Sequence, residues 1–176
     1  QKAYQGWLGG CNLAEIKDSG TFTLLPLELP CDGLQVLKVP MPKTRPFFRS
    51  GGGGAAGLTE LTHYYIELRA PHGIDRTLQP EVQIRASGDI RASTQRGLHT
   101  WFLDMVPGTT RQDGLKAGGT FTDPAQGVTI SVVSVDASQA TVRVQFPEGE
   151  APGGGPTCLD GTTLTPPGPG PQSCAA

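Results

Sequence analysis

Histidine is the residue type in this sequence best suited to metal binding or proton transfer, and it occurs three times, at His63, His72 and His99. None belongs to an HExxH motif, which would place two zinc ligands on one helix face with a glutamate base between them. There is no GxSxG motif for a nucleophilic serine, and the glycine run 51–54 is not followed by GK[ST] as in a phosphate loop. We therefore expect ordinary surface or core histidines, and predict no catalytic or metal-binding residue in this chain.

Four aspartates fall at the ends of predicted strands or in turns: Asp75, Asp104, Asp123 and Asp136. Carboxylates in such positions can hold calcium, which prefers oxygen ligands. They also accept hydrogen bonds from nearby backbone N–H groups and so stabilise turns. We expect turn capping and keep a calcium site as the alternative.

The four cysteines form two local pairs along the sequence, so we predict disulfides Cys11–Cys31 and Cys158–Cys174. No CxxC spacing and no neighbouring histidine point to zinc. Disulfides persist in oxidising compartments, which predicts a secreted or cell-surface location. The alternative is a cytosolic protein with four buried free thiols.

The composition excludes several classes of function. The 176 residues include 36% hydrophobic and 17% charged residues, with a formal net charge of −2. Nucleic-acid binding needs clustered Lys and Arg, and none is present, so we expect no nucleic-acid partner. No apolar stretch is long enough to span a bilayer, so no membrane span is expected. The first residue is Gln1, with no signal peptide, which indicates a mature or excised fragment.

The segment 59–70 is the clearest structural element of the sequence. Side chains alternate between the two faces of a strand, and this period places Tyr64, Ile66 and Leu68 toward a core. The residues on the opposite side are Tyr65, Glu67 and Arg69.

Similar alternation elsewhere predicts about nine short strands, in segments 12–17, 21–27, 34–39, 59–70, 81–86, 98–106, 115–123, 127–135 and 140–146. The phase changes at Val132-Val133, which predicts either a β-bulge or a strand buried on both faces. The last two strands should form a hairpin. No segment has the 3.6-residue period of a helix, so we predict an all-β fold, an antiparallel β-sandwich.

Two regions lack this alternation. Segment 40–57 is predicted to be a long loop, where Phe47 and Phe48 either form an exposed contact site or close the bottom of the sandwich. The region after residue 147 is rich in proline and glycine and favours polyproline II. We therefore predict a β-sandwich domain over 1–147 and a disulfide-closed tail over 148–176.

Six segments occur in an order that resembles a known family. They are QGWL (5–8), SGTFTLLPLE (19–28), GLQVLKVP (33–40), HYYIELRAPHGID (63–75), GGTFTDPAQGVTISVVS (118–134) and ATVRVQF (140–146). Together they resemble the region that follows the catalytic domain in gametolysin-like secreted zinc metallopeptidases, which were named for lysis of algal cell walls.

The resemblance implies a non-catalytic β-sandwich. In that family the zinc site lies on an HExxH helix upstream of the GWL segment, so no catalytic or metal residue carries over, and zinc is expected only in a catalytic domain outside this chain. The implied partners are its own protease domain or an extracellular-matrix or cell-wall glycoprotein. Whether the chain belongs to an enzyme is left open. The alternative is a free-standing structural or adhesive module of a cell wall or cell surface.

Overall fold

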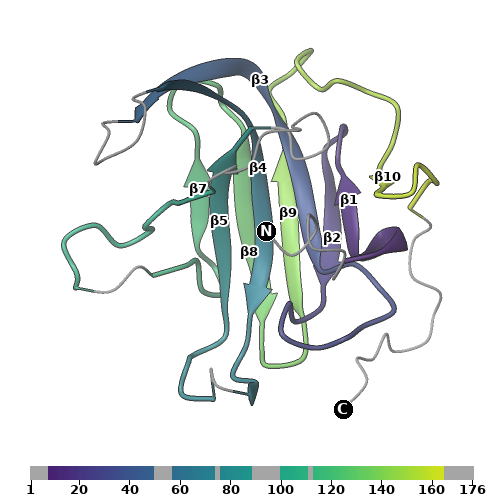
Figure 1. Cartoon of the computed structure of the whole chain (residues 1–176), viewed down its shortest axis with the longest axis vertical. Helices are drawn as coiled ribbons and strands as arrows, with labels where there is room; N and C mark the ends of the chain where they lie inside the picture. Colours follow the sequence, from purple (N-terminus) through teal and green to yellow (C-terminus); the bar gives the residue numbers. More distant parts are fainter. Residues whose placement is uncertain (1–7, 50–56, 74–75, 89–99, 111–112, 165–176) are drawn as a thin grey trace.

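The protein folds into two facing β-sheets, as the sequence pattern predicts (Figure 1). The computed structural model describes residues 8–49, 57–73, 76–88, 100–110 and 113–164. The six-stranded sheet has the order β10-β1-β3-β4-β5-β6, and the four-stranded sheet has the order β2-β9-β8-β7. The strands are β1 (Leu13–Glu15), β2 (Gly20–Leu24), β3 (Val36–Arg49), β4 (Gly57–Arg69), β5 (Glu81–Ser87), β6 (Trp101–Phe102), β7 (Thr120–Thr122), β8 (Thr129–Val135), β9 (Ala140–Gln145) and β10 (Thr157–Cys158). The only helical element among the described residues is the short 3₁₀ turn η1 (Gly10–Asn12). No helix in this part of the chain is long and apolar enough to cross a membrane.

The core lies between the inner faces of the two sheets. On β4, Tyr64, Ile66 and Leu68 are each at most 2% exposed, which confirms the alternation predicted for this strand. The facing strand β9 buries Val142 and Val144 completely. The predicted irregularity in β8 is a bulge, since the register with β9 shifts between Val132 and Ser134. The predicted β8–β9 hairpin is also confirmed.

The largest difference from the predicted elements is segment 40–57, where a loop was expected. Strand β3 continues to Arg49 and β4 begins at Gly57, and the two remain paired beyond a register shift between Pro40 and Arg45. The prolines are tolerated because β1 pairs with β3 only as far as Lys38, so the rest of β3 has β4 alone as a described neighbour. Phe47 and Phe48 pair with β4 through their backbones, and their side chains lie outside the described residues.

The outer face of the six-stranded sheet is also partly buried, which the alternation alone did not indicate. Tyr65 is 4% exposed and its hydroxyl donates to the Gly88 carbonyl at 3.0 Å. Lys38 is fully buried, with its Nζ 2.9 Å from a Glu15 carboxylate oxygen. Burial alone would raise the pKa of Glu15, but the hydrogen bond and charge of Lys38 outweigh it and hold that pKa below its usual value.

The predicted cysteine pairing is wrong. Cys11 forms a disulfide with Cys158, joining η1 to β10 across a separation of 147 residues. Cys31 is also disulfide-bonded, and its partner lies outside the described residues. Strand β10 pairs with β1, so Ala14 lies opposite Cys158 at the edge of the six-stranded sheet. The pairing of β10 with β1 brings a distant part of the chain to Cys11. Proximity in the sequence therefore does not decide which thiols form a disulfide.

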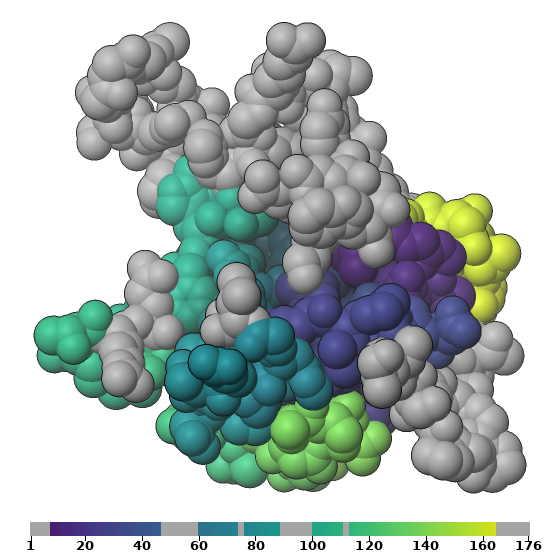
Figure 2. Space-filling model, turned by 60° about the horizontal axis from the view of Figure 1, so that its bottom comes forward, coloured from purple at the N-terminus to yellow at the C-terminus, as the bar shows by residue number. Residues whose placement is uncertain are grey.

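The turns at one end of the sandwich pack side by side (Figure 2). His72, beyond the end of β4, places its Nε2 3.0 Å from the Ala137 carbonyl oxygen in the β8–β9 turn. Leu27 donates its backbone N–H to the Leu68 carbonyl at 3.2 Å. These contacts hold the two sheets together at this end.

Candidate binding groove at the sandwich edge

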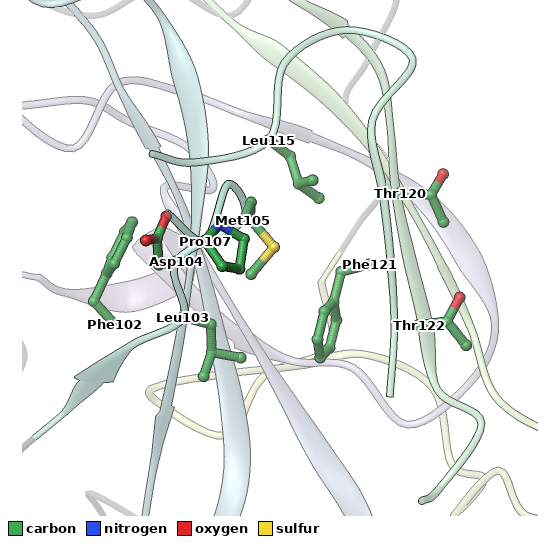
Figure 3. A pocket seen from close by; sticks show the side chains of 9 residues that line it. All are labelled: Phe102, Leu103, Asp104, Met105, Pro107, Leu115, Thr120, Phe121 and Thr122. Atoms are coloured by element: carbon green, nitrogen blue, oxygen red, sulfur yellow. The ribbon is translucent and has the colours of Figure 1, made fainter. Parts of the chain in front are cut away.

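A groove opens where the edge strands of the two sheets, β6 and β7, lie on the same side of the sandwich. We call it the edge groove, and its volume is about 530 Å³. It is lined by Phe102, Leu103, Asp104, Met105, Pro107, Leu115, Thr120, Phe121 and Thr122. Figure 3 shows the Leu103, Met105 and Phe121 side chains converging, whereas Thr120 and Thr122 point to the other side of β7. The side chains that converge in the groove are therefore apolar, whereas polar atoms make up a large part of its exposed lining.

The crossing of the chain from one sheet to the other shapes one wall of the groove. Leu115 exchanges two backbone hydrogen bonds with Val82 on β5, at 2.8 and 2.9 Å. Gly114 packs so closely on Val82 that a Cβ there would lie 2.6 Å from the Val82 carbonyl oxygen. Gly118 then adopts a φ of +80°, which glycine tolerates without strain, and the chain enters β7.

The other wall follows β6. Leu103 donates its backbone N–H to the Ile84 carbonyl at 2.9 Å, which extends the β5–β6 pairing by one bond. The Arg85 guanidinium carbon lies 5.6 Å from the centroid of the Phe102 ring, and Arg85 Nε is also 2.9 Å from the Glu67 carboxylate. A guanidinium over an aromatic face is attracted by the ring electrons, so Phe102 has a defined position.

The end of β7 is fixed by a buried carboxylate. Asp123, which follows β7, is 1% exposed. Its carboxylate accepts hydrogen bonds from the Tyr64 hydroxyl, from the Arg45 guanidinium and from the Ala125 N–H. The donors come from β4, β3 and the β7–β8 turn, so one side chain ties β7 to the opposite sheet.

The charge distribution around Asp123 shifts two pKa values. Burial alone would raise the pKa of Asp123, but the hydrogen bonds from Tyr64 and Ala125, with the Arg45 charge, outweigh it and lower that pKa. Burial, together with the hydrogen bond to the carboxylate, raises the pKa of Tyr64 far above its usual value. Asp123 is thus ionised and Tyr64 protonated at neutral pH.

The outer edge of β7 presents free backbone groups. The pairs Asp123–Val128 and Gly119–Val132 are hydrogen-bonded between β7 and β8. Bonded and non-bonded pairs alternate in an antiparallel ladder, so Phe121 is bonded to β8 while Thr120 and Thr122 turn their N–H and C=O groups outward. No described residue pairs with this side of β7.

The residues singled out in the sequence for chemistry do not come together. His63 Nδ1 lies 2.7 Å from the Thr62 hydroxyl, while His72 contacts the β8–β9 turn, and His99 lies outside the described residues. Among the described residues, no group of three or more His, Cys, Asp or Glu side chains is placed to hold a metal ion.

Asp136 and Asp104 cap turns, as predicted, whereas Asp123 caps the β7–β8 turn through Ala125 and also bonds to the opposite sheet. Asp136 Oδ1 accepts the Ser138 and Gln139 N–H groups at 2.7 and 3.0 Å. Asp104 Oδ1 accepts the N–H groups of Val106 and Asp113 at 3.1 and 3.2 Å. Asp75 lies outside the described residues.

Sequence reasoning did not find the edge groove. The alternation of Thr120, Phe121 and Thr122 identifies Phe121 as the inward-facing residue of a short strand. Leu103 and Met105 lie beyond the end of β6, in a stretch that the pattern predicted to be one strand over 98–106. Only the stacking of the two sheets places these residues opposite Phe121.

Comparison of the chain with protein-family models, with curated proteins and with solved structures found no match in any of the three.

Proposed function

We propose that this chain is a non-catalytic extracellular module of a gametolysin-like secreted metallopeptidase, which supports the protease domain or directs it to an extracellular matrix. The edge groove carries the proposal. Most of the residues that line it have apolar side chains, and the Asp104 carboxylate accepts hydrogen bonds from backbone N–H groups. Such a lining is typical of a binding site, because the apolar side chains provide contact area and the few polar groups provide specificity.

The position of the family-like segments supports the same proposal. The segments 19–28, 33–40, 63–75, 118–134 and 140–146 contain β2, the start of β3, most of β4, β7 with most of β8, and β9. They therefore belong to one sandwich and not to scattered surface loops. The Cys11–Cys158 disulfide fits an oxidising, extracellular location.

The parentage is tested by reading the coding region upstream of this chain. We expect a secretory signal followed by a catalytic domain with HExxH. An upstream region without that motif would remove the metallopeptidase from the proposal and favour a free-standing structural or adhesive module.

The binding role is tested with purified components. The catalytic domain, produced separately, should bind the intact chain in a pull-down, and Met105→Glu should weaken the association because it places a charge in the groove. Val133→Glu is the matched control, because Val133 is an exposed apolar residue (53% exposed) on β8 outside the groove. An equal loss of binding with both variants would contradict binding through the groove. Unchanged binding with both variants would contradict it as well.

The matrix role is tested by cosedimentation with insoluble cell-wall glycoprotein, using the same two variants. Retention on wall material without binding to the catalytic domain would assign the chain to adhesion. A folded chain that binds neither component would contradict the whole proposal.

A further inference from the structure

We propose that β7 and the edge groove together bind one extended peptide segment of a partner protein, which adds to the four-stranded sheet as a fifth strand beside β7. Three independent features of this edge carry the inference: the free backbone groups, the apolar groove beside them and the fixed position of β7. The inference shares one premise with the proposed function, namely that the chain acts by binding another protein.

The backbone of β7 supplies the first feature. Thr120 and Thr122 each direct one N–H and one C=O away from β8, so an antiparallel partner strand could form about four hydrogen bonds with them. Strand addition to an exposed edge is a general mode of peptide recognition, in which main-chain bonds provide affinity and side-chain pockets provide specificity.

The groove supplies the second feature. A strand added next to β7 would place its inward-facing side chain beside Phe121 and over Leu103 and Met105, which converge there (Figure 3). Its neighbours on either side would point outward with Thr120 and Thr122. The outer face beside them carries hydroxyl groups, since the Thr120 hydroxyl donates a hydrogen bond to that of Ser131 at 3.1 Å. The site therefore selects a peptide with an apolar residue between two polar, preferably hydroxyl-bearing, residues.

The fixed position of β7 is the third feature. The Asp123 carboxylate ties the end of β7 to Tyr64 and Arg45 in the opposite sheet. The start of β7 is held by Gly118 and Gly119, which exchange backbone bonds with Val132 at 2.8 and 2.9 Å. A strand held at both ends is already in its binding conformation, so little ordering is needed when a peptide binds.

A single extended chain fits this edge better than a second copy of the protein does. The segment that follows β6, described over 103–110, projects sideways past β7 (Figure 1). Two copies meeting edge to edge would bring these projecting segments against each other. Val106, 46% exposed, lies on this segment and adds apolar surface beside the groove.

The experiment uses the intact chain and a labelled peptide that copies residues 127–132, GVTISV, with one lysine at each end. This sequence already pairs with β7 from the β8 side, so its side-chain pattern is compatible with Phe121 and its neighbours. Fluorescence anisotropy should show saturable binding, and a peptide of the same composition in scrambled order should bind at least about tenfold more weakly.

Hydrogen exchange gives a readout specific to strand addition. With peptide bound, the amide hydrogens of Thr120 and Thr122 should exchange more slowly, while that of Phe121, already bonded to β8, should change little. Uniform protection of all three, or protection elsewhere in the sheet, would overturn the proposal.

Two peptides N-methylated at alternate residues form the matched control. In an added strand, alternate N–H groups face β7 and solvent, so one methylation pattern should reduce binding about tenfold or more and the other less than about twofold. Equal affinities for the two patterns would exclude backbone pairing. This comparison uses the unaltered protein, so it does not depend on whether any variant folds.

On the protein side, Thr122→Pro removes an outward N–H without removing a bond to β8, and should abolish binding. Gln145→Ala, on β9 of the same sheet, should bind as the unaltered protein does. Dimers that form without peptide and protect Thr120 and Thr122 would assign the edge to a second copy and overturn the proposal. No catalytic domain or matrix enters these assays, so their failure is separate from a failure of the protease association.

Discussion

The Tyr64 hydroxyl donates a hydrogen bond to a carboxylate oxygen of Asp123, and this contact joins the two sheets of the sandwich. Tyr64 lies on β4 in the six-stranded sheet, and Asp123 follows β7 in the four-stranded sheet. Arg45 on β3 donates to the other carboxylate oxygen. The contact thus links the center of the core to the strand that borders the edge groove.

We expect Tyr64→Phe to lower the free energy of unfolding by about 1–3 kcal/mol, because it removes a hydrogen bond from a buried carboxylate. Tyr64→Ala should cost about 3–5 kcal/mol, since it also leaves a cavity. Urea unfolding provides the measurement. Tyr65→Phe is the matched control: it removes a bond to an uncharged carbonyl and should cost less than Tyr64→Phe. A loss below about 1 kcal/mol for Tyr64→Ala would contradict the core position of this ring.

The Asp123 network predicts how stability depends on pH. The pKa of Asp123 in the folded protein lies below its ordinary value of 3.8, so the unfolded chain binds the proton more readily than the folded protein does. The stabilisation is therefore fully present above the ordinary value and is lost as pH falls through the folded pKa. Urea unfolding between pH 3 and pH 7, at intervals of about half a unit, should show this decline. Asp123→Asn should be less stable at neutral pH and show a shallower decline, and an unchanged decline would assign the acid sensitivity to other carboxylates.

Gly127 in the β7–β8 turn should resist substitution. It has a φ of +70°, and a Cβ there would lie 3.0 Å from Cγ of Pro147. The left-handed conformation alone costs an L-residue about 1–2 kcal/mol, so Gly127→Ala should lower the free energy of unfolding by at least this amount. Gly149, with a φ of +76° and no atom within 4 Å of the same position, serves as the control. If Gly149→Ala is as destabilising as Gly127→Ala, the contact with Pro147 adds nothing.

The disulfide is tested by peptide mapping without reduction. Cleavage after Lys and Arg leaves Cys158 and Cys174 on one fragment, so a second cleavage at Asp160 is needed to separate them. We expect a fragment containing Cys11 to be linked to the one containing Cys158. A Cys11–Cys31 link would contradict the structure. Replacing Cys11 and Cys158 together by Ser should cost about 2–5 kcal/mol, because this bond closes a long loop.

The predictions from sequence succeeded where one strand decides the outcome. The alternation in β4 and β9 reports which side chains face the core, because successive residues of a strand point to opposite faces. The phase change at Val132-Val133 marked an irregularity for the same reason, and the structure decided that it is a bulge and not a strand buried on both faces. The turn at Asp136 was also predictable, since its side chain bonds to the backbone only two and three residues away.

The predictions failed where the outcome depends on which strands are neighbours. Segment 40–57 has no alternation and contains prolines, yet β3 continues to Arg49 because β4 pairs with it beyond the bulge. Tyr65 is buried because it belongs to a second hydrophobic cluster on the outer face of the six-stranded sheet. The other buried members of this cluster are Leu8, Leu13, Leu27 and Val36. Strand propensity acts locally, whereas burial of a second face depends on what packs against it.

By itself, the sequence determined that this protein is an all-β sandwich and which face of its best strands is inside, because the period of two is a property of the local backbone. Tertiary structure alone decided that Cys11 meets Cys158, that Asp123 meets Tyr64, and that Phe121 faces Leu103 and Met105 across the edge groove. Each of these pairs is separated by more than 15 residues. Such contacts arise from strand order and sheet stacking, for which the spacing of residues along the chain carries little information.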